Sequence, residues 1–119
     1  MDLLTNYLHE PGCVRGIIAG DFNTVWPEDK KLIDKRKGLL DAWEELHRMA
    51  GPNGHTWGVS TKLGEGPQPG RLDKVVMMGL TPKDIEVMHP GSIRVPKPDR
   101  EISIPWSDHY GLKCTFAIE

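Results

Sequence analysis

Three short polar motifs each stand at the end of an apolar run, and this pattern constrains the fold of the chain more than any other feature. The motifs are Gly-Asp-Phe-Asn at 20–23, Arg-Leu-Asp at 71–73 and Ser-Asp-His at 107–109, beside apolar segments at 14–19 and 75–78 and a segment at 110–118 in which apolar residues alternate with others. Short apolar runs bounded by turn residues predict buried β-strands. The chain therefore delivers carboxylates, an amide and an imidazole at strand ends, where a rigid backbone can hold them for chemistry.

The side chains at these strand ends match the needs of phosphate-ester hydrolysis. That reaction needs a base for the attacking water, donors for the phosphate oxygens, a partner that orients the imidazole and an anchor for a divalent metal. The candidates are Asp21, Asn23, Asp73, Asp108 and His109. The sequence therefore indicates a phosphoesterase site built from these residues.

The order of the three motifs resembles the endonuclease/exonuclease/phosphatase family, the Mg²⁺-dependent phosphoesterases that include DNase I and abasic-site endonucleases. Two smaller matches lie between the motifs. Segment 38–46 is similar to the family's helix after the first motif, and Thr56-Trp57 is similar to its Thr-Trp strand. Each match alone is a weak signal, but three motifs in family order over nearly the whole chain are a specific one.

The resemblance covers only the second half of a family domain. Family members are roughly twice as long as this chain, in line with a single domain of about 250 residues. We therefore interpret residues 1–119 as the C-terminal half of one endonuclease/exonuclease/phosphatase domain. In the family, the first half supplies an asparagine, a metal-binding glutamate and further phosphate contacts, so we expect these groups to be missing here.

The resemblance also implies the fold. Family domains are four-layer α/β/β/α sandwiches, in which two sheets pack face to face and helices lie outside. This α/β chain would supply half of that sandwich, one mixed sheet with its outer helices. The inner sheet face would lack its partner, and an exposed apolar face is an association surface. We expect a homodimer that packs sheet to sheet, or the missing N-terminal half, to cover it.

Hydrophobic periodicity predicts the elements that carry the motifs. Helices are expected at 2–9 and 38–49, the second because Leu39, Trp43 and Leu46 recur at helical spacing. Strands are expected at 14–19, 55–59, 71–78, 85–88, 93–95 and 110–118, and a Pro-rich stretch follows at 96–105. The continuous apolar character of 14–19 favours an interior strand that is buried on both faces.

The resemblance gives each site residue a role. Asp21 would accept a proton from the attacking water, and Asn23 would orient that water or a phosphate oxygen. His109 would donate a hydrogen bond to the scissile phosphate, and Asp73 would accept one from the imidazole and fix its tautomer. Asp108 would bind Mg²⁺, which needs only one or two protein carboxylates. Without the glutamate of the first half, we expect this Mg²⁺ site to be weak or incomplete.

Structural alternatives exist for these residues. Asp21 and Asn23 could simply form a turn, because both side chains bond to nearby backbone. Asp108 could cap a loop, and His109 could be a partly buried polar residue.

The second motif and the exposed aromatic residues also have alternatives. Asp73 could pair with Arg71 or Lys74 within its own segment instead of with the histidine. Trp26 and Trp106 stand on loops beside the motifs, where stacking on a substrate ring and ordinary packing are equally good explanations.

Composition adds limits on function and location. A formal charge of −2 provides no basic excess of the kind that tight nucleic-acid binders carry. Cys13 and Cys114 fit neither a disulfide framework nor a metal motif. No apolar run is long enough to span a membrane, and no secretory signal pattern is present, so an intracellular location is the default expectation.

Two functions follow from the sequence. The first is a Mg²⁺-dependent, nuclease-like phosphodiesterase half-domain, with DNA, RNA, a phospholipid head group or a small phosphate ester as the open choices of substrate. The second is a non-catalytic, truncated relative that self-associates and keeps the site residues as relics. The missing glutamate makes us expect an inactive isolated chain, because a single transition-state donor is worth about 10²–10³ in rate.

Overall fold

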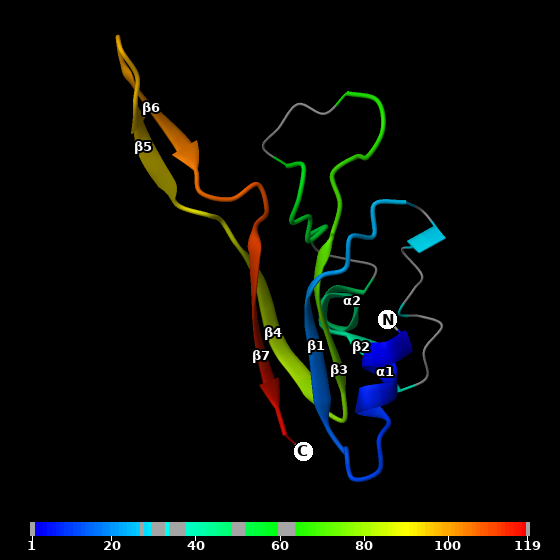
Figure 1. Ribbon diagram of the computed structural model, residues 1–119. Helices are drawn as coiled ribbons and strands as arrows, with labels where there is room; N and C mark the ends of the chain where they lie inside the picture. Colours follow the sequence, from blue (N-terminus) through cyan, green and yellow to red (C-terminus); the bar gives the residue numbers. More distant parts are fainter. Residues whose placement is uncertain are drawn as a thin grey trace.

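A computed structural model describes residues 2–26, 28–29, 33, 38–48, 52–59 and 64–118 of the protein. Strands dominate, and the helices are short (Figure 1). In chain order the elements are α1 (Asp2–Leu8), β1 (Gly16–Asp21), β2 (Leu40–Asp41), α2 (Ala42–His47), β3 (Asp73–Met78), β4 (Thr81–Met88), β5 (Ser92–Pro96), β6 (Glu101–Pro105) and β7 (Gly111–Ala117). Neither α1 nor α2, the helices of this described part, is long and apolar enough to cross a membrane.

The strands form three small sheets, which corrects the expected single mixed sheet. Their orders are β1-β3-β2, β4-β7 and β5-β6, and every pair in the described ranges is antiparallel. Parallel neighbours need a crossover connection of about a dozen residues, usually a helix. Among the described strands, only β5 and β6 are paired strands joined by a short turn, whereas the turn after β3 leads into β4, which pairs with β7 in another sheet. The α/β class predicted from the sequence is present, with many strands and few helical residues.

The core lies where α2 packs against β3 and β4. Ala42, Trp43, Met77 and Ile85 form its buried cluster, and Leu112 of β7 packs against them. Burying a side chain of Met or Ile size contributes roughly 1.5–3 kcal/mol relative to leaving it exposed. This cluster therefore fixes β3, which carries Asp73, against the rest of the body.

Helix α2 is shorter than the predicted helix at 38–49. Leu40–Asp41 pairs with β3 as strand β2 instead of entering the helix. Asp41 then caps the helix, because its Oδ1 accepts a hydrogen bond from the backbone N–H of Trp43 at 3.1 Å. The helix stops at Arg48, whose φ of 40° is left-handed. Residues 49–51, where the sequence suggested the end, lie outside the described residues.

Strand β1 is not the interior strand that its apolar sequence predicted. It lies at the edge of its sheet, with β3 as its only described neighbour strand. Ile17 is 40% exposed, and Val14 just before the strand is also exposed. The side chains of Phe116 and Ile118 in and after β7 are exposed as well, so the predicted alternation of 110–118 holds only as far as Cys114. The apolar sequence pattern suggested burial, but no described layer of the chain covers these side chains.

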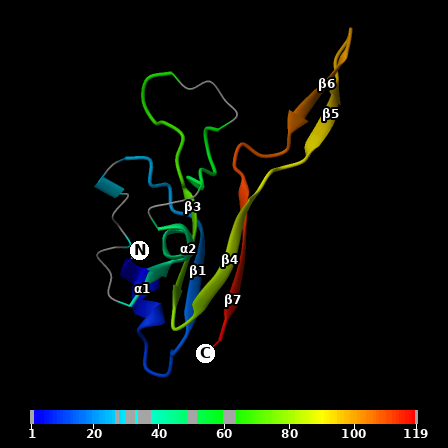
Figure 2. The same ribbon diagram turned by 180° about the vertical axis from the view of Figure 1, so that it is seen from behind.

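The β5–β6 hairpin extends away from the body, as Figures 1 and 2 show from opposite sides. It makes the molecule long in one direction, with extents of 61 × 31 × 30 Å. Strand β6 falls in the Pro-rich stretch and was missed by the sequence argument, because Pro96 and Pro105 stand only at strand ends, where a missing donor is tolerated. The predicted strand at 55–59 is reduced to isolated bridges made by Trp57.

Candidate functional site

The two motif aspartates lie side by side because of strand register. In the β1–β3 pair, Asp21 and Asp73 are direct partners at the end of the ladder. The pairing continues one step further, where the N–H of Phe22 donates to the carbonyl oxygen of Leu72 at 2.7 Å. The first and second motifs are therefore joined by sheet hydrogen bonds, and their carboxylates are placed by rigid backbone.

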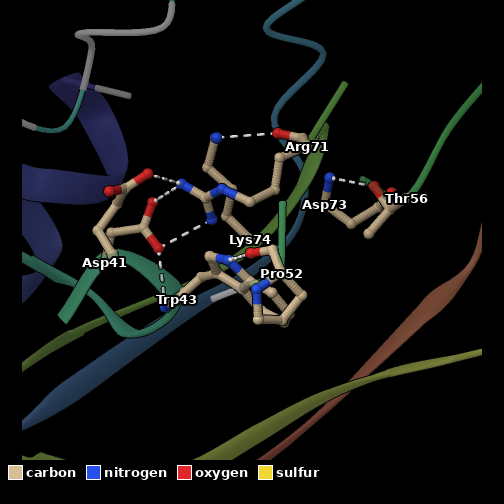
Figure 3. Close-up of polar contacts among 8 residues, drawn as sticks. Asp41, Trp43, Pro52, Thr56, Arg71, Asp73 and Lys74 are labelled. Atoms are coloured by element: carbon tan, nitrogen blue, oxygen red, sulfur yellow. Dashed lines mark hydrogen bonds and ion pairs between the residues drawn. The ribbon is translucent and has the colours of Figure 1, made fainter. Parts of the chain in front are cut away.

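The segment at 56–57 brings the third motif to the same place. Trp57 bridges His109, and the carbonyl oxygen of Thr56 accepts a hydrogen bond from the N–H of Tyr110 at 2.7 Å. The hydroxyl of Thr56, a fully buried residue, accepts from the N–H of Asp73 at 3.0 Å (Figure 3). Thr56 thus ties Asp73 to the histidine segment. Thr56 was given no role from the sequence, although the likeness of Thr56-Trp57 to the family's Thr-Trp strand was the signal for it.

His109 contacts both aspartates. Its Nδ1 lies 2.6 Å from Oδ2 of Asp73, and its Nε2 lies 3.9 Å from Oδ2 of Asp21. The first distance is that of a short hydrogen bond, whereas the second is an ion-pair distance without a direct hydrogen bond. The expected contact between Asp73 and the histidine is present. The imidazole therefore stands between two carboxylates, held by one and facing the other.

Arg71, one of the alternative partners of Asp73, pairs instead with Asp41 and Glu44. Arg71 is bound by the carboxylate of Asp41, with Nη1 to Oδ1 at 2.9 Å, and it also contacts Glu44 at 3.3 Å. Lys74 donates from Nζ to the carbonyl oxygen of Arg71 at 2.9 Å (Figure 3). Arg71 thus belongs to the support of α2 rather than to the aspartate that binds His109.

The charge state of His109 follows from these neighbours. The hydrogen bond with the Asp73 carboxylate is the largest influence, and it raises the pKa of His109 above the usual 6.5. Partial burial acts in the opposite direction, while the negative charges of Asp73, Asp21 and Asp108 raise the pKa further. A protonated imidazole has two N–H donors. One is used by Asp73, and the Nε2 donor is left for another group.

Asp21 and Asn23 form the turn that was the structural alternative to a catalytic role, and this turn leaves Oδ2 of Asp21 open. The N–H of Asn23 donates to Oδ1 of Asp21 at 2.7 Å, and Asn23 has a φ of 51°, which asparagine tolerates better than most residues. This bond orients the Asp21 carboxylate without using Oδ2, the oxygen nearest His109. The turn is therefore part of how the side chain is held.

The described residues do not by themselves assemble a metal site. Asp108 is exposed, and its charge acts on the neighbouring His109. Within the ranges that the structure describes, no group of three or more His, Cys, Asp or Glu side chains could hold a metal ion. Mg²⁺ binds through one or two carboxylates with several waters, so Asp108 remains a predicted ligand, and the donors present do not make a full protein cage.

The two exposed tryptophans line different cavities. Trp26 borders a cavity of about 280 Å³ with Thr24 and Leu72, on the side of the first motif. Trp106 borders one of about 340 Å³ that also touches His109. Both rings thus lie near the motif residues, but only the Trp106 cavity includes a residue of the carboxylate–imidazole cluster.

A solved structure has a similar fold. The crystal structure of D. rerio TDP2 complexed with single strand DNA product matches this chain with a TM-score of 0.63 and 25% sequence identity. The match covers 98% of this chain and 47% of that chain. The fold of this chain thus matches part of an endonuclease/exonuclease/phosphatase, or DNase I-like, domain. No family model matches the sequence, and no curated protein does either.

The match confirms the family that the three motifs predicted. It also confirms that the chain corresponds to only part of a DNase I-like domain, since it spans about half the length of the TDP2 chain. Within this family fold, the motif residues meet at one place, where the end of β1, the start of β3 and the segment before β7 come together.

Proposed function

We propose that this chain is a half-domain of a Mg²⁺-dependent, nuclease-like phosphodiesterase, and that Asp21, Asn23, Asp73 and His109 are its part of the catalytic site. One observation carries the proposal. The His109 ring is held by Asp73 at 2.6 Å and faces Asp21 at 3.9 Å. An imidazole held at Nδ1, with Nε2 open beside a free carboxylate oxygen, is a suitable pair for contacting a phosphate and a water molecule.

His109 is the phosphate-binding group of this proposal. Asp73 raises the pKa of His109 and so favours the protonated form, in which Nε2 can donate to a non-bridging oxygen of the scissile phosphate. Negative charge grows on these oxygens during attack, and a fixed cationic donor stabilises it. Asp73 is a positioning residue, because it acts through the imidazole.

Asp21 is the proposed base. Its Oδ1 is occupied by the N–H of Asn23, which leaves Oδ2 to accept the proton of the attacking water. The side chain is 47% exposed, so water reaches it freely. Asn23 is exposed beside it, and its amide would orient that water or a phosphate oxygen.

The metal requires ligands beyond the described donors. Asp108 would supply one carboxylate, and a glutamate from the other half of a DNase I-like domain would supply another. Bound Mg²⁺ would add Lewis-acid stabilisation of charge on the phosphoryl oxygens. A second polypeptide half, or a second copy of this chain, would at the same time cover exposed apolar side chains such as Ile17 and Phe116.

The proposed substrate is a nucleic-acid phosphodiester. The TDP2 structure that matches this chain is a complex with a single strand DNA product. Likeness of fold supports extending that class of substrate to the complete site of this protein. A non-catalytic, self-associating module is the second candidate, and the incomplete donor set among the described residues favours it for the isolated chain.

Complementation tests the proposed function. The chain is assayed for hydrolysis of a single-stranded oligonucleotide, alone and mixed with the part of TDP2 that it does not match, in Mg²⁺ or in EDTA. We expect negligible turnover alone and Mg²⁺-dependent turnover in the mixture. Asp21→Asn should abolish it, and His109→Ala should reduce it by about 10²–10³.

The control for Asp21→Asn is Asp99→Asn, the same change on the exposed turn of the β5–β6 hairpin. It should leave turnover unchanged. Turnover that survives Asp21→Asn would refute the assigned base. No turnover in any combination, with both polypeptides folded and associated, would favour the non-catalytic module.

A further inference from the structure

The proposed chemistry leaves unused a cavity of about 340 Å³ beside His109. It lies between the end of β4 and the segment that leads into β7. Its walls include Met88, His89, Pro90, Trp106, His109 and Tyr110. Pockets for small ligands begin at about 300 Å³, so its size fits one compact ring system.

Trp106 is exposed but fixed in place. The residue is 66% exposed, and its backbone N–H donates to the carbonyl oxygen of Gly91 at 3.1 Å. A Cβ added at Gly91 would lie 2.4, 2.6 and 3.0 Å from Cη2, Cζ3 and Cζ2 of the indole. The ring therefore rests where a side chain at position 91 would be. An open and fixed indole loses little side-chain entropy when another ring stacks on it.

Two further rings line the cavity, and one of them is tied to the carboxylate–imidazole cluster. The rings of His89 and Tyr110 meet edge to face with centroids 4.5 Å apart. The backbone of Tyr110 is bound to Thr56, the residue that also binds Asp73. The cavity is thus held at a fixed position relative to the imidazole of His109.

We propose that this cavity takes an unpaired base of single-stranded nucleic acid, stacked on Trp106, while His109 contacts an adjoining phosphate. This inference rests on the proposed function and adds to it the substrate form and a recognition residue. Bases stack on aromatic side chains without strong sequence preference, because every base has a π-face. An acyl chain would need an enclosed apolar channel, whereas this cavity is open at Trp106 and has polar groups at His89 and Ser107.

Binding in EDTA tests the proposal without any need for catalysis. The probes are a labelled hexathymidylate and an abasic strand with the same phosphates, each titrated by fluorescence anisotropy at low salt. Stacking on one aromatic residue is worth roughly 5- to 150-fold in affinity. We expect Trp106→Ala to weaken hexathymidylate binding by about tenfold, Trp106→Phe to weaken it less, and neither change to alter binding of the abasic strand.

A matched pair of glycine substitutions tests the position of the ring without changing Trp106. Gly91→Ala places a methyl group against the indole and should displace it, whereas Gly64→Ala meets nothing within 4 Å. Neither glycine has a positive φ, so the two changes differ in space and not in backbone strain. Gly91→Ala should reduce hexathymidylate affinity nearly as much as Trp106→Ala, and Gly64→Ala should not change it.

The outcomes separate this inference from the proposed function. Base-dependent binding that needs Trp106, in a protein that never hydrolyses a phosphodiester, would support the cavity and remove the catalytic role. Turnover that needs Asp21, together with hexathymidylate affinity unchanged by Trp106→Ala and by Gly91→Ala, would overturn the cavity alone. Equal affinity for the hexathymidylate and the abasic strand, or no binding of either, would also overturn it. Circular dichroism verifies that each variant is folded.

Discussion

Arg71 and Asp73, two residues apart in sequence, each take part in a carboxylate–cation contact, and the two contacts differ in burial. Arg71 and Asp41 form a two-point contact whose side chains are only 11% and 7% exposed. Asp73 and His109 form a one-point contact whose side chains are 22% and 26% exposed. The first contact lies beside the N-terminus of α2, and the second lies at the candidate site.

The comparison shows how the same interaction can serve structure or chemistry. The Asp41 carboxylate is fully used, because it binds Arg71 and also caps α2 through Trp43. His109 keeps one ring nitrogen for another partner, with Asp21 at 3.9 Å as its nearest charge. A buried pair with all its hydrogen bonds made contributes to holding the fold, whereas an open pair with one donor unused is ready to bind a ligand.

The largest effect is expected from removing the buried carboxylate. Asp41→Ala leaves Arg71 with only the exposed Glu44 as a carboxylate partner and α2 without its cap. Breaking a buried pair in this way costs about 3–5 kcal/mol, and losing a helix cap costs about 1 kcal/mol. We expect the free energy of unfolding, measured by urea titration, to fall by at least about 3 kcal/mol.

Glu45→Ala is the control for that substitution. Glu45 contacts Arg48 at 3.0 Å on the same helix, but these side chains are 41% and 74% exposed. Exposed pairs contribute about 0–1 kcal/mol. Equal losses for the two variants would contradict the distinction between the buried and the open contact.

A smaller loss is expected at the residue that joins the site segments. Thr56→Val keeps the side-chain shape but removes the hydroxyl that accepts from the N–H of Asp73. An unpaired buried donor costs about 1–3 kcal/mol, which a urea titration resolves. Thr115→Val, on an exposed position of β7, should change the free energy of unfolding by less than about 0.5 kcal/mol. A loss at Thr115 as large as that at Thr56 would remove Thr56 from this role.

The next effect is on charge rather than on stability. Asp73→Asn removes the group that raises the pKa of His109, so that pKa should fall. An NMR titration of the His109 ring measures it, and Asp99→Asn is the control that should leave it unchanged. A His109 pKa that does not fall in Asp73→Asn would show that this aspartate does not set the charge of the ring.

The same contact makes stability depend on pH, with a defined sign. The folded state holds the pKa of His109 above its usual 6.5. Its contribution to stability is therefore complete below about pH 6.5 and is lost as the pH rises through the folded pKa. The difference in unfolding free energy between the wild type and Asp73→Asn should shrink over that interval. A difference that grows with rising pH would contradict this.

The sequence predicted most where the chemistry of a residue limits its possible partners. The likeness to the family and to only part of its domain was predicted from motif order. A carboxylate at the start of an apolar strand needs a partner, and the family resemblance chose His109 over Arg71 and Lys74. The role of Thr56 was missed, since a buried hydroxyl leaves no periodic signal. The partners of Arg71 were missed because Asp41 is about thirty residues away in sequence.

The burial of β1 and the sheet arrangement could not be derived from pattern. An apolar run such as 14–19 signals that something covers it, but not whether the cover lies in the same chain. Ile17 is 40% exposed for that reason. Strand β6 was missed because prolines at 96 and 105 suggested an irregular segment, while only the paired partner β5 shows that they stand at strand ends.

The smallest effect is expected from Mg²⁺ on the chain alone, and it tests how open the candidate site is. Asp108 is exposed, and no three-donor group exists among the described residues, so we expect an affinity no tighter than millimolar. A ligand present at its dissociation constant stabilises a fold by only about 0.4 kcal/mol. One millimolar Mg²⁺ should therefore change the free energy of unfolding by no more than that, and Asp108→Asn should make no further difference. Calorimetric titration measures the affinity directly. Micromolar binding would correspond to about 4 kcal/mol at the same concentration, and it would mean that further carboxylates, from a second copy of the chain, complete the site. In that case the carboxylates of the candidate site would be occupied, as the carboxylate of Asp41 is, and only Nε2 of His109 would remain open to a ligand.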